Sequence, residues 1–450
     1  MKSKKVYLIG AGPGRADLIT IRGMNILKEA DVIVYDYLVD KALLEDVKDD
    51  AELICCDQLA KGRRHPDGFL KRQENINKVL VKKAKGGNRV VRLKNGDPAI
   101  FSRGSQELGA LTKNHIEFEI VPGVTAASAA SSFSGIPLTD KRFASSCVFV
   151  TGHEDPTKPS SLLDWNSLSK SGTLALYMSV GNLSYVIRRV LEAGKDEDTP
   201  VAIVQNVSLI TQKVLRGTLK DIVAKAKRSN VKPPAVIIIG EVAKMEEDFN
   251  WLKKGKRILF TGLSKERYFE NDIYFHLPLI RILPIKSYKQ FDRYIRDIRK
   301  FDWIVYASRY GADYFFKRLR HVGYDSRKLA GINIAAIGKS TKNRLLDFGV
   351  LANFLPKEES SRGLIEAFKK VNLKGKKIFM PRSNISDKGL KDALRKLGAH
   401  VTTGIAYRNV APKDLPNLDL KFFNEIMFTS PSTVRNFKKR YKKVPKNIKI

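Results

Sequence analysis

Asp97 and Arg103 place a carboxylate and a guanidinium in one short stretch that follows an apolar run at residues 90–93. Gly96 tolerates positive φ and Pro98 cannot continue a strand, so the chain must turn sharply there. Because Gly96 has no side chain, a ligand can approach the backbone while the two charged groups bind its polar parts. The stretch predicts a ligand-binding loop; an ordinary strand-ending turn followed by a salt bridge is the alternative interpretation.

Two further loops of small residues follow apolar runs in the same way. Residues 10–14 follow the run at 6–9, residues 121–130 follow another run, and Asp36 ends the run at 32–35. Apolar runs alternate with helical patterns throughout this part of the chain, which predicts a mostly parallel α/β sheet buried between helices. Ligands of such sheets bind at the carboxyl ends of the strands, where these loops and Asp36 lie.

Together, the three loops and Asp36 resemble the tetrapyrrole methylase family over roughly the first 245 residues. The resemblance implies a two-lobed α/β domain at residues 1–245, with lobes at about 1–120 and 121–245. It also implies S-adenosyl-L-methionine as the methyl donor and C-methylation of uroporphyrinogen III to precorrin-2. Methyl transfer from a sulfonium needs alignment more than acid–base groups, and the main-chain oxygens of strand-end loops suit a cationic sulfur.

The resemblance also assigns the residues that bind the methyl donor. They are Pro13, Asn95, Gly96, Asp97, Ile100, Thr125, Ala126 and Met178. Asn95 replaces the first of two glycines that the family usually has, and asparagine tolerates left-handed backbone. Val207 stands where the family has a further glycine, so the resemblance does not assign a cofactor contact to this position. Met178 ends an apolar run, so a place in the hydrophobic core is its alternative interpretation.

By the same resemblance, Asp36 is the proton acceptor, which suits a reaction in which the methylated pyrrole must lose a proton. A helix or turn cap is the alternative role for Asp36. The family's partner lysine falls near Gln58, and Lys61 is the nearest substitute. Arg103 is assigned to a substrate carboxylate, which a guanidinium binds well. Gln106, also assigned to the substrate, stands where the family has the first of two glutamates.

Residues 256–450 form a second α/β region with a short internal repeat. The run at 302–308 resembles the run at 424–430, and each ends in serine before a helical pattern, so two similar lobes are predicted. With Tyr407 and its neighbours, this region resembles the uroporphyrinogen-III synthase family.

This second resemblance implies a domain of two flavodoxin-like lobes. One lobe would comprise about 256–280 plus 411–450, the other about 289–399, and residues 246–255 would form the linker before them. Residues 447–450 look like the start of a strand that the family would continue. We therefore expect the synthase domain to be incomplete at its C-terminus.

The implied second reaction is the cyclisation of hydroxymethylbilane to uroporphyrinogen III. Ser308, Thr341 and Ser430 would bind the carboxylates of the substrate, and the phenol of Tyr407 would assist departure of its hydroxyl group. Each of the three aliphatic hydroxyls has a helix N-cap as its alternative role. Tyr407 is the residue that this alternative explains least easily.

The composition limits the class of protein. Among 450 residues, 82 Lys and Arg stand against 47 Asp and Glu, which gives a net charge of +35. Such an excess suits a polyanionic partner such as a carboxylate-rich tetrapyrrole, although a lysine-rich solvated surface explains it equally well. Three cysteines without a pairing pattern indicate a reduced, cytoplasmic chain, and no apolar run approaches a membrane span. The six histidines are scattered, so we expect no metal.

Other functions stay open at this point. The methylase fold also serves RNA and protein substrates, and the basic charge would suit RNA. A non-catalytic basic binding protein is a further alternative, but aromatic residues do not interleave with lysine in a stacking pattern. The loop at residues 10–14 also allows a dinucleotide site, with Asp36 at about the right distance. Relatives of the methylase suggest a homodimer through that domain, and nucleic acid or a membrane is not the expected partner.

Overall fold

The computed structural model describes residues 5–45, 47–48, 50–59, 66–153, 161–263 and 273–450. The chain divides into two compact units, one containing the residues up to Ile258 and the other most of the residues that follow. Within the described ranges, no helix has both the length and the apolar character that a bilayer crossing requires.

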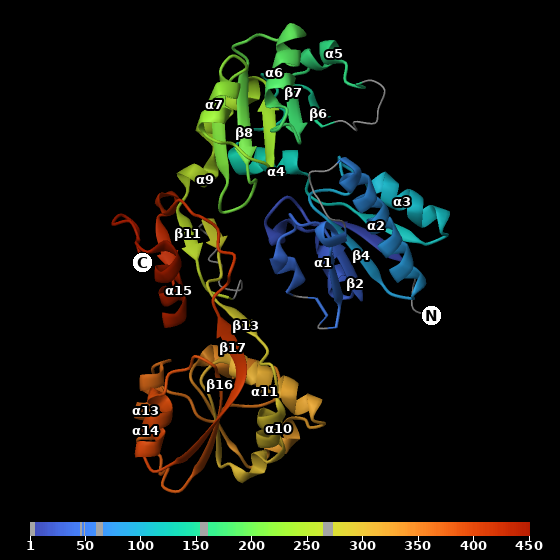
Figure 1. Cartoon of the computed structure of the whole chain (residues 1–450). Helices are drawn as coiled ribbons and strands as arrows, with labels where there is room; N and C mark the ends of the chain where they lie inside the picture. The colour runs from blue at the N-terminus through green and yellow to red at the C-terminus, as the bar shows by residue number, and fades with distance from the viewer. Residues whose placement is uncertain (1–4, 46, 49, 60–65, 154–160, 264–272) are drawn as a thin grey trace. The chain divides into compact units, whose positions relative to one another are not determined.

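The first lobe of the first unit is a five-stranded sheet in the order β3-β2-β4-β1-β5, and all its strand pairs are parallel. This arrangement confirms the predicted parallel α/β sheet. The strands are β1 (Val6–Gly10), β2 (Val32–Tyr35), β3 (Glu52–Cys55), β4 (Val90–Lys94) and β5 (Phe118–Val121). Helix α1 (Ile21–Lys28) packs on one face, and α2 (Pro66–Lys85) and α3 (Gly104–Lys113) pack on the other (Figure 1). The carboxyl ends of all five strands therefore lie on the same side of the sheet, where ligands of such sheets bind.

The second lobe contains a mixed sheet in the order β6-β7-β10-β8-β9. Its strands are β6 (Cys147–Thr151), β7 (Thr173–Tyr177), β8 (Pro200–Gln205), β9 (Lys213–Thr218) and β10 (Ala235–Ile239). Only β6 and β7 pair in parallel, and the other pairs are antiparallel. Helix α4 (Ala126–Ser134) covers one face, and α5 (Trp165–Ser169), α6 (Leu183–Glu192) and α7 (Ile222–Arg228) cover the other.

The segment that the sequence suggested as a linker is folded. It forms α8 (Glu246–Phe249) and α9 (Trp251–Lys254) beside α4. Trp251 Nε1 donates a hydrogen bond to the carbonyl oxygen of Ser132 at 2.7 Å, and Leu252 is buried. Lys253, Lys254, Glu247 and Asp248 stay exposed, whereas Glu246 is buried. The exposed charges are the reason that the segment looks like a solvated linker in the sequence.

The second unit is built on a sheet in the order β13-β17-β16-β14-β15 (Figure 1). The strands are β13 (Arg281–Leu283), β14 (Trp303–Tyr306), β15 (Asn333–Ala336), β16 (Lys377–Ser383) and β17 (His400–Val410). Strand β13 runs antiparallel to β17, and the other pairs are parallel. The helices α10 (Lys289–Arg296), α11 (Arg309–His321) and α12 (Lys339–Leu346) cover one face, and α13 (Ser361–Phe368) and α14 (Gly389–Lys396) cover the other.

A smaller sheet has the order β12-β11-β18, and the division between the two compact units runs through it. Its strands are β11 (Arg257–Phe260), β12 (Ile273–His276) and β18 (Glu425–Met427), and α15 (Pro431–Tyr441) follows.

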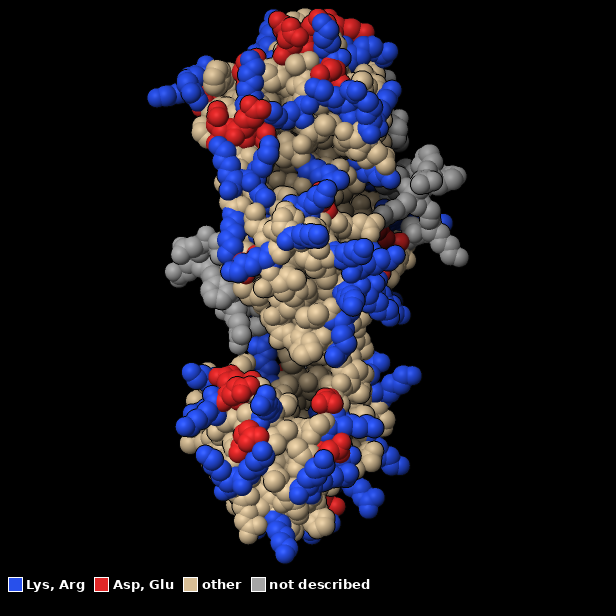
Figure 2. Space-filling view, turned by 90° about the vertical axis from the view of Figure 1, so that its left-hand side faces the viewer, with Lys and Arg blue, Asp and Glu red and all other residues tan. Residues whose placement is uncertain are grey.

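Basic side chains are widely distributed on the surface. Figure 2 shows many Lys and Arg side chains on the visible face, with small groups of Asp and Glu and areas of other residues among them.

Candidate active site

A cavity of about 530 Å³ lies in the first unit and is lined by residues from both of its lobes. Its volume falls within the usual range of small-molecule sites, about 300–1,000 Å³. Among its lining residues are Asp36, Asn95, Gly96, Asp97, Ile100, Arg103, Thr125, Ala126 and Met178. The structure thus brings most of the residues expected in this domain's site to one cavity, and Pro13 and Gln106 are the described exceptions.

Three backbone segments meet beside this cavity because glycines allow them to. A Cβ on Gly123 would lie 2.4 Å from the carbonyl oxygen of Gly96, and a Cβ on Gly10 would lie 2.6 Å from Gly123 Cα. Gly12 and Gly96 exchange backbone hydrogen bonds of 3.2 and 3.0 Å. The ends of β1, β4 and β5 can therefore approach only as bare main chain.

Asp97 fastens these segments together. Its Oδ2 accepts a hydrogen bond from the amide of Gly123 at 2.9 Å, and its Oδ1 accepts one from the amide of Ala99 at 2.7 Å. Both carboxylate oxygens are thus engaged by main chain. The side chain holds the shape of the loop, and the main chain of that loop lines the cavity.

Asp36, just after β2, also has both carboxylate oxygens engaged in hydrogen bonds. Its Oδ1 accepts from Arg92 Nη2 at 2.6 Å, and its Oδ2 accepts from the amide of Asn95 at 3.2 Å. Burial by itself would raise the pKa of Asp36, but the charges of Arg92 and Lys94 and the hydrogen bonds lower that pKa below its ordinary value. Asp36 is therefore an ionised carboxylate at neutral pH.

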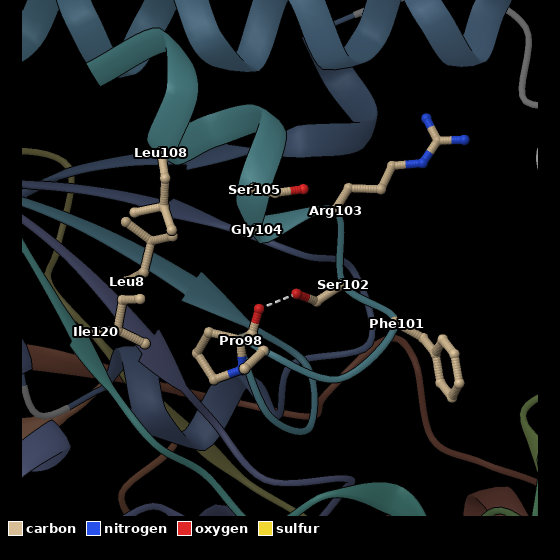
Figure 3. Close-up of a pocket in the computed structure, with 10 residues that line it drawn as sticks. Leu8, Pro98, Phe101, Ser102, Arg103, Gly104, Ser105, Leu108 and Ile120 are labelled. Atoms are coloured by element: carbon tan, nitrogen blue, oxygen red, sulfur yellow. Dashed lines mark hydrogen bonds between the residues drawn. The ribbon is translucent and has the colours of Figure 1, made fainter. Parts of the chain in front are cut away.

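Arg103 and Gln106 lie in different surroundings. Arg103 adopts a left-handed φ of 57° just before α3 and lines the cavity. Figure 3 shows a second hollow, of about 390 Å³, next to the same loop, and the Arg103 side chain extends away from Leu8 and Ile120 there. Within the described residues Arg103 forms no ion pair, whereas Gln106 is exposed and lines neither of these two cavities.

The position expected for the partner lysine is only partly described. Lys61 lies outside the described residues. Gln58 is exposed, whereas its neighbours Cys56 and Asp57 line the cavity. Burial raises the pKa of the Cys56 thiol to about 12, so the thiol is neutral. Arg72 also lines the cavity, and its Nη1 lies 3.6 Å from Asp57 Oδ1. Arg72 therefore supplies a cation next to Cys56 and Asp57.

Tyr177 is a lining residue that sequence reasoning missed. Its hydroxyl forms a 2.7 Å hydrogen bond with Thr125 Oγ1 and accepts another from the amide of Ala127 at 3.0 Å. Met178 follows with a φ of 52° and is 51% exposed, so it lines the cavity and does not join the core. The available signal was a tyrosine directly before that methionine at the end of an apolar strand.

Pro13 does not line the cavity, but its loop is fixed by the other lobe. Ser208 Oγ donates to the carbonyl oxygen of Pro13 at 3.1 Å and accepts from the amide of Arg15 at 3.1 Å. Val207 is buried in the core of the second lobe, so its side chain does not project toward this loop. A Cβ on Gly14 would lie 2.7 Å from the carbonyl oxygen of Val207.

In the second unit, the buried Tyr407 forms a hydrogen bond with the partly exposed Ser308. Tyr407 Oη and Ser308 Oγ lie 2.8 Å apart, and Ser308 Oγ also accepts from the amide of Gly311 as the N-cap of α11. The register of β16 and β17 shifts between Arg382 and Ser383, which reorients the strand just before Tyr407. Burial raises the pKa of the Tyr407 phenol, and the hydrogen bonds from serine oppose this effect.

Thr341 and Ser430 do not join that pair. Thr341 is buried within α12. Ser430 is the N-cap of α15 and accepts a hydrogen bond from the amide of Thr433 at 3.3 Å. Ser430 Oγ also lies 2.9 Å from Ser432 Oγ. The cap interpretation therefore accounts for one of the two side-chain contacts of Ser430 and for one of the two of Ser308.

Comparison with known proteins finds two families along the chain. Residues 5–223 match the family described as Tetrapyrrole (Corrin/Porphyrin) Methylases, and residues 273–450 match Uroporphyrinogen-III synthase HemD. A "Porphyrin biosynthesis protein HemD" of Ruminiclostridium josui is 33% identical over 98% of this chain and 89% of its own length.

Two shorter relatives match the first half. A "Uroporphyrinogen-III C-methyltransferase" of Methanocaldococcus jannaschii is 46% identical over 53% of this chain and 96% of its own length. An "S-adenosyl-L-methionine-dependent uroporphyrinogen III methyltransferase" of Methanosarcina barkeri is 42% identical over 54% of this chain and 93% of its own length.

Proposed function

The chain belongs to the tetrapyrrole (corrin/porphyrin) methylases and carries a uroporphyrinogen-III synthase domain after them, and on this premise we propose where each of its reactions takes place. The protein is a bifunctional enzyme of tetrapyrrole biosynthesis. It methylates uroporphyrinogen III to precorrin-2 with S-adenosyl-L-methionine, and it cyclises hydroxymethylbilane to uroporphyrinogen III. The methylase occupies residues 1–245 and the synthase residues 256–450 in our proposal.

The cavity of the first unit is the proposed methylation site. The convergence of strand-end loops from both lobes on one cavity carries this proposal. A Cβ on Gly96 would point toward the carbonyl oxygen of Val124 and the amide of Ala126, both 3.9 Å away, so this glycine keeps open a space framed by main chain. Such a space fits a cofactor with a positively charged sulfur, because carbonyl oxygens favour a cation.

When bound, S-adenosyl-L-methionine supplies an electrophilic methyl group, and the protein supplies its alignment with the pyrrole carbon. The main chain at Gly96, Thr125 and Ala126 and the side chains of Ile100 and Met178 would hold the donor. Arg103 would bind a carboxylate of the tetrapyrrole. Asp36, held ionised, would accept the proton that leaves the methylated ring.

The Tyr407–Ser308 pair marks the proposed synthase site. Tyr407 has a neutral phenol, since burial raises its pKa, and Ser308 Oγ holds the hydroxyl in place. A neutral phenol in a fixed position suits donation of a proton to a departing hydroxyl group. Thr341 and Ser430 remain proposed carboxylate ligands, with support from the sequence resemblance alone.

We also propose a homodimer through the methylase domain and a cytoplasmic location. The edge strand β5 exposes Phe118 and Ile120 to 37% and 44%, which suits an interface between copies. Cys55, Cys56 and Cys147 are free thiols, as expected in a reducing compartment. Replacing Ile120 by Lys should shift the sedimentation of the protein from dimer to monomer, and a wild type that sediments as a monomer would refute the dimer.

Both activities can be tested on the 450-residue chain. Isothermal titration with S-adenosylhomocysteine should show tight binding to the wild type. Incubation with hydroxymethylbilane should give the type III porphyrin isomer, and addition of S-adenosyl-L-methionine should convert it to the dimethylated product. Absence of S-adenosylhomocysteine binding would refute the methylation site, and formation of the type I isomer alone would refute the synthase site.

A further inference from the structure

Strand β4 carries two buried cations in the middle of a parallel sheet. Arg92 is 3% exposed and Lys94 is 2% exposed, and they alternate with Val91 and Leu93, which pack in the core on the opposite face. Strands in that position are normally hydrophobic on both faces. The cations face the side covered by α2 and α3, so burying them requires partners there.

Glu107 on α3 supplies that partner with both of its oxygens. Its carboxylate is fully buried, Oε1 accepts from Arg92 Nε at 2.9 Å, and Oε2 accepts from Lys94 Nζ at 2.8 Å. Gln73 on α2, which lines the cavity, also donates to Oε1 at 3.4 Å. Glu107 itself does not line the cavity.

A continuous chain of hydrogen bonds leads from Glu107 to the cavity. Arg92 turns its Nε to Glu107 and its Nη2 to Asp36, and Asp36 then accepts the amide of Asn95. The Asn95–Asp97 loop begins at that amide. The orientation of the Arg92 guanidinium therefore fixes both the carboxylate at the cavity and the first residue of the loop that lines it.

The charges in this group balance, because two cations meet two carboxylates. Buried ion pairs of this kind seldom stabilise a protein more than hydrophobic residues of similar size would. Burial and the neighbouring Arg92 lower the pKa of Lys94, a further cost of this arrangement. Arg92 Nη1 donates to the carbonyl oxygens of Leu93 at 3.1 Å and Val34 at 3.4 Å, and Glu107 adds a contact at Nε that a hydrophobic residue would not provide.

We propose that Glu107, together with Lys94, is a positioning group for the methylation site: Glu107 orients Arg92, and Arg92 holds Asp36 and the start of the Asn95–Asp97 loop. Lys94 neutralises the second oxygen of Glu107 and keeps that carboxylate in one orientation. The inference rests on the proposed function of the cavity, since only methylation there gives the position of Asp36 a consequence.

Two double variants of the full-length protein separate orientation from charge and folding. Lys94→Met/Glu107→Gln and Lys94→Met/Glu107→Leu both remove one cation and one anion, so the buried charge stays balanced. The Gln variant keeps an oxygen that can accept from Arg92 Nε, and the Leu variant does not. We expect the Gln variant to stay within about 3-fold of the wild-type kcat for methylation, and the Leu variant to fall about 10–100-fold, as misplacement of a catalytic group does.

The exposed pair of Arg216 and Glu247 in the same unit provides a matched control. Glu247→Gln should leave kcat and KM unchanged. Equal kcat values in the two double variants, with both folded by circular dichroism, would overturn the proposal. If the Leu variant does not fold, the Gln variant decides, and a loss of about tenfold or more there overturns the proposal too. A wild type that binds no S-adenosylhomocysteine would instead overturn the function assigned to the cavity.

Discussion

Replacement of Gly123 by Ala tests whether the cavity depends on main-chain contact between strand ends. The added Cβ would lie 2.4 Å from the carbonyl oxygen of Gly96 and 2.7 Å from Gly10 Cα, whereas ordinary contacts begin at 3.4 Å. Both neighbours are backbone and cannot turn away as a side chain could. One strand end must therefore shift by about 1 Å, and the hydrogen bond between Gly123 and Asp97 must shift with it.

The size of the effect follows from this overlap. Overpacking of this kind costs about 1–3 kcal/mol in folding free energy. Because the displaced loop lines the cavity, we expect the dissociation constant for S-adenosylhomocysteine to rise about 10–100-fold, since a 1 Å error in position has effects of that order. The methylation rate at low donor concentration should fall by at least as much.

Gly109 provides a control in the same lobe. A Cβ there meets no atom within 4 Å, and the residue lies in α3. Gly109→Ala should raise the free energy of unfolding by about 0.5–1 kcal/mol and leave ligand binding unchanged. Isothermal titration of both variants and the wild type is the assay. Wild-type affinity in Gly123→Ala would show that the strand ends do not need to touch for the site to form.

Further predictions concern single groups. Tyr177→Phe removes the hydroxyl that bonds Thr125, and it should weaken S-adenosylhomocysteine binding by about 1–2 kcal/mol in titration; unchanged affinity would refute the role of this phenol. Tyr407→Phe should slow the cyclisation of hydroxymethylbilane about 100-fold or more while methylation of supplied uroporphyrinogen III continues at the wild-type rate, and a normal cyclisation rate would exclude proton donation by Tyr407. Asp36 has a lowered pKa when folded, so its ionic contribution to stability is present above the unfolded pKa and lost as the pH falls through the folded one. The difference in unfolding free energy between the wild type and Asp36→Asn should stay constant from about pH 5 to 8 and shrink only in stronger acid, and a change within that range would contradict the lowered pKa.

The loops that line the cavity could be predicted from the sequence because their signals are local. Gly96 and Pro98 mark a turn wherever they occur after an apolar run, and Thr125 lies in a similar loop. Their meeting in one cavity follows from the parallel order of the strands, which the alternation of apolar runs and helices also indicates. This part of the site was predictable for those reasons.

The buried charges were not predictable, because they depend on contacts distant in the sequence. Arg92 sits within a run that looks like an ordinary strand, and nothing local shows that Glu107 and Asp36 will both meet it. Tyr177 was missed for the same reason, since its partners are Thr125, the N-cap of α4, and Ala127 within α4, which lie far earlier in the chain. The segment 246–255 was taken as a linker because of its many charged residues, and the burial of Glu246, Asn250 and Leu252 depends on contacts that the local sequence does not show.

The structure also separates two neighbours that the sequence presents as a pair. Gln106 is exposed, whereas Glu107 is fully buried between two cations. Loss of Glu107 would leave two buried cations against one carboxylate, which costs about 3–5 kcal/mol, whereas the exposed position carries no such penalty.

The two aspartates of the cavity have their carboxylates engaged by the protein itself. Asp97 accepts hydrogen bonds from two backbone amides, and Asp36 accepts hydrogen bonds from the Arg92 side chain and the amide of Asn95. Their first effect is to fix the position of main chain, and the main chain then presents its oxygens and amides to the space between the lobes. In the methylation site that we propose, recognition of a donor with a positively charged sulfur would therefore depend on the position of the main chain. Such a role would explain why glycines occupy the closest contacts between the strand ends. It would also explain the buried charges on β4 and α3, which add little stability but hold the residues next to these contacts.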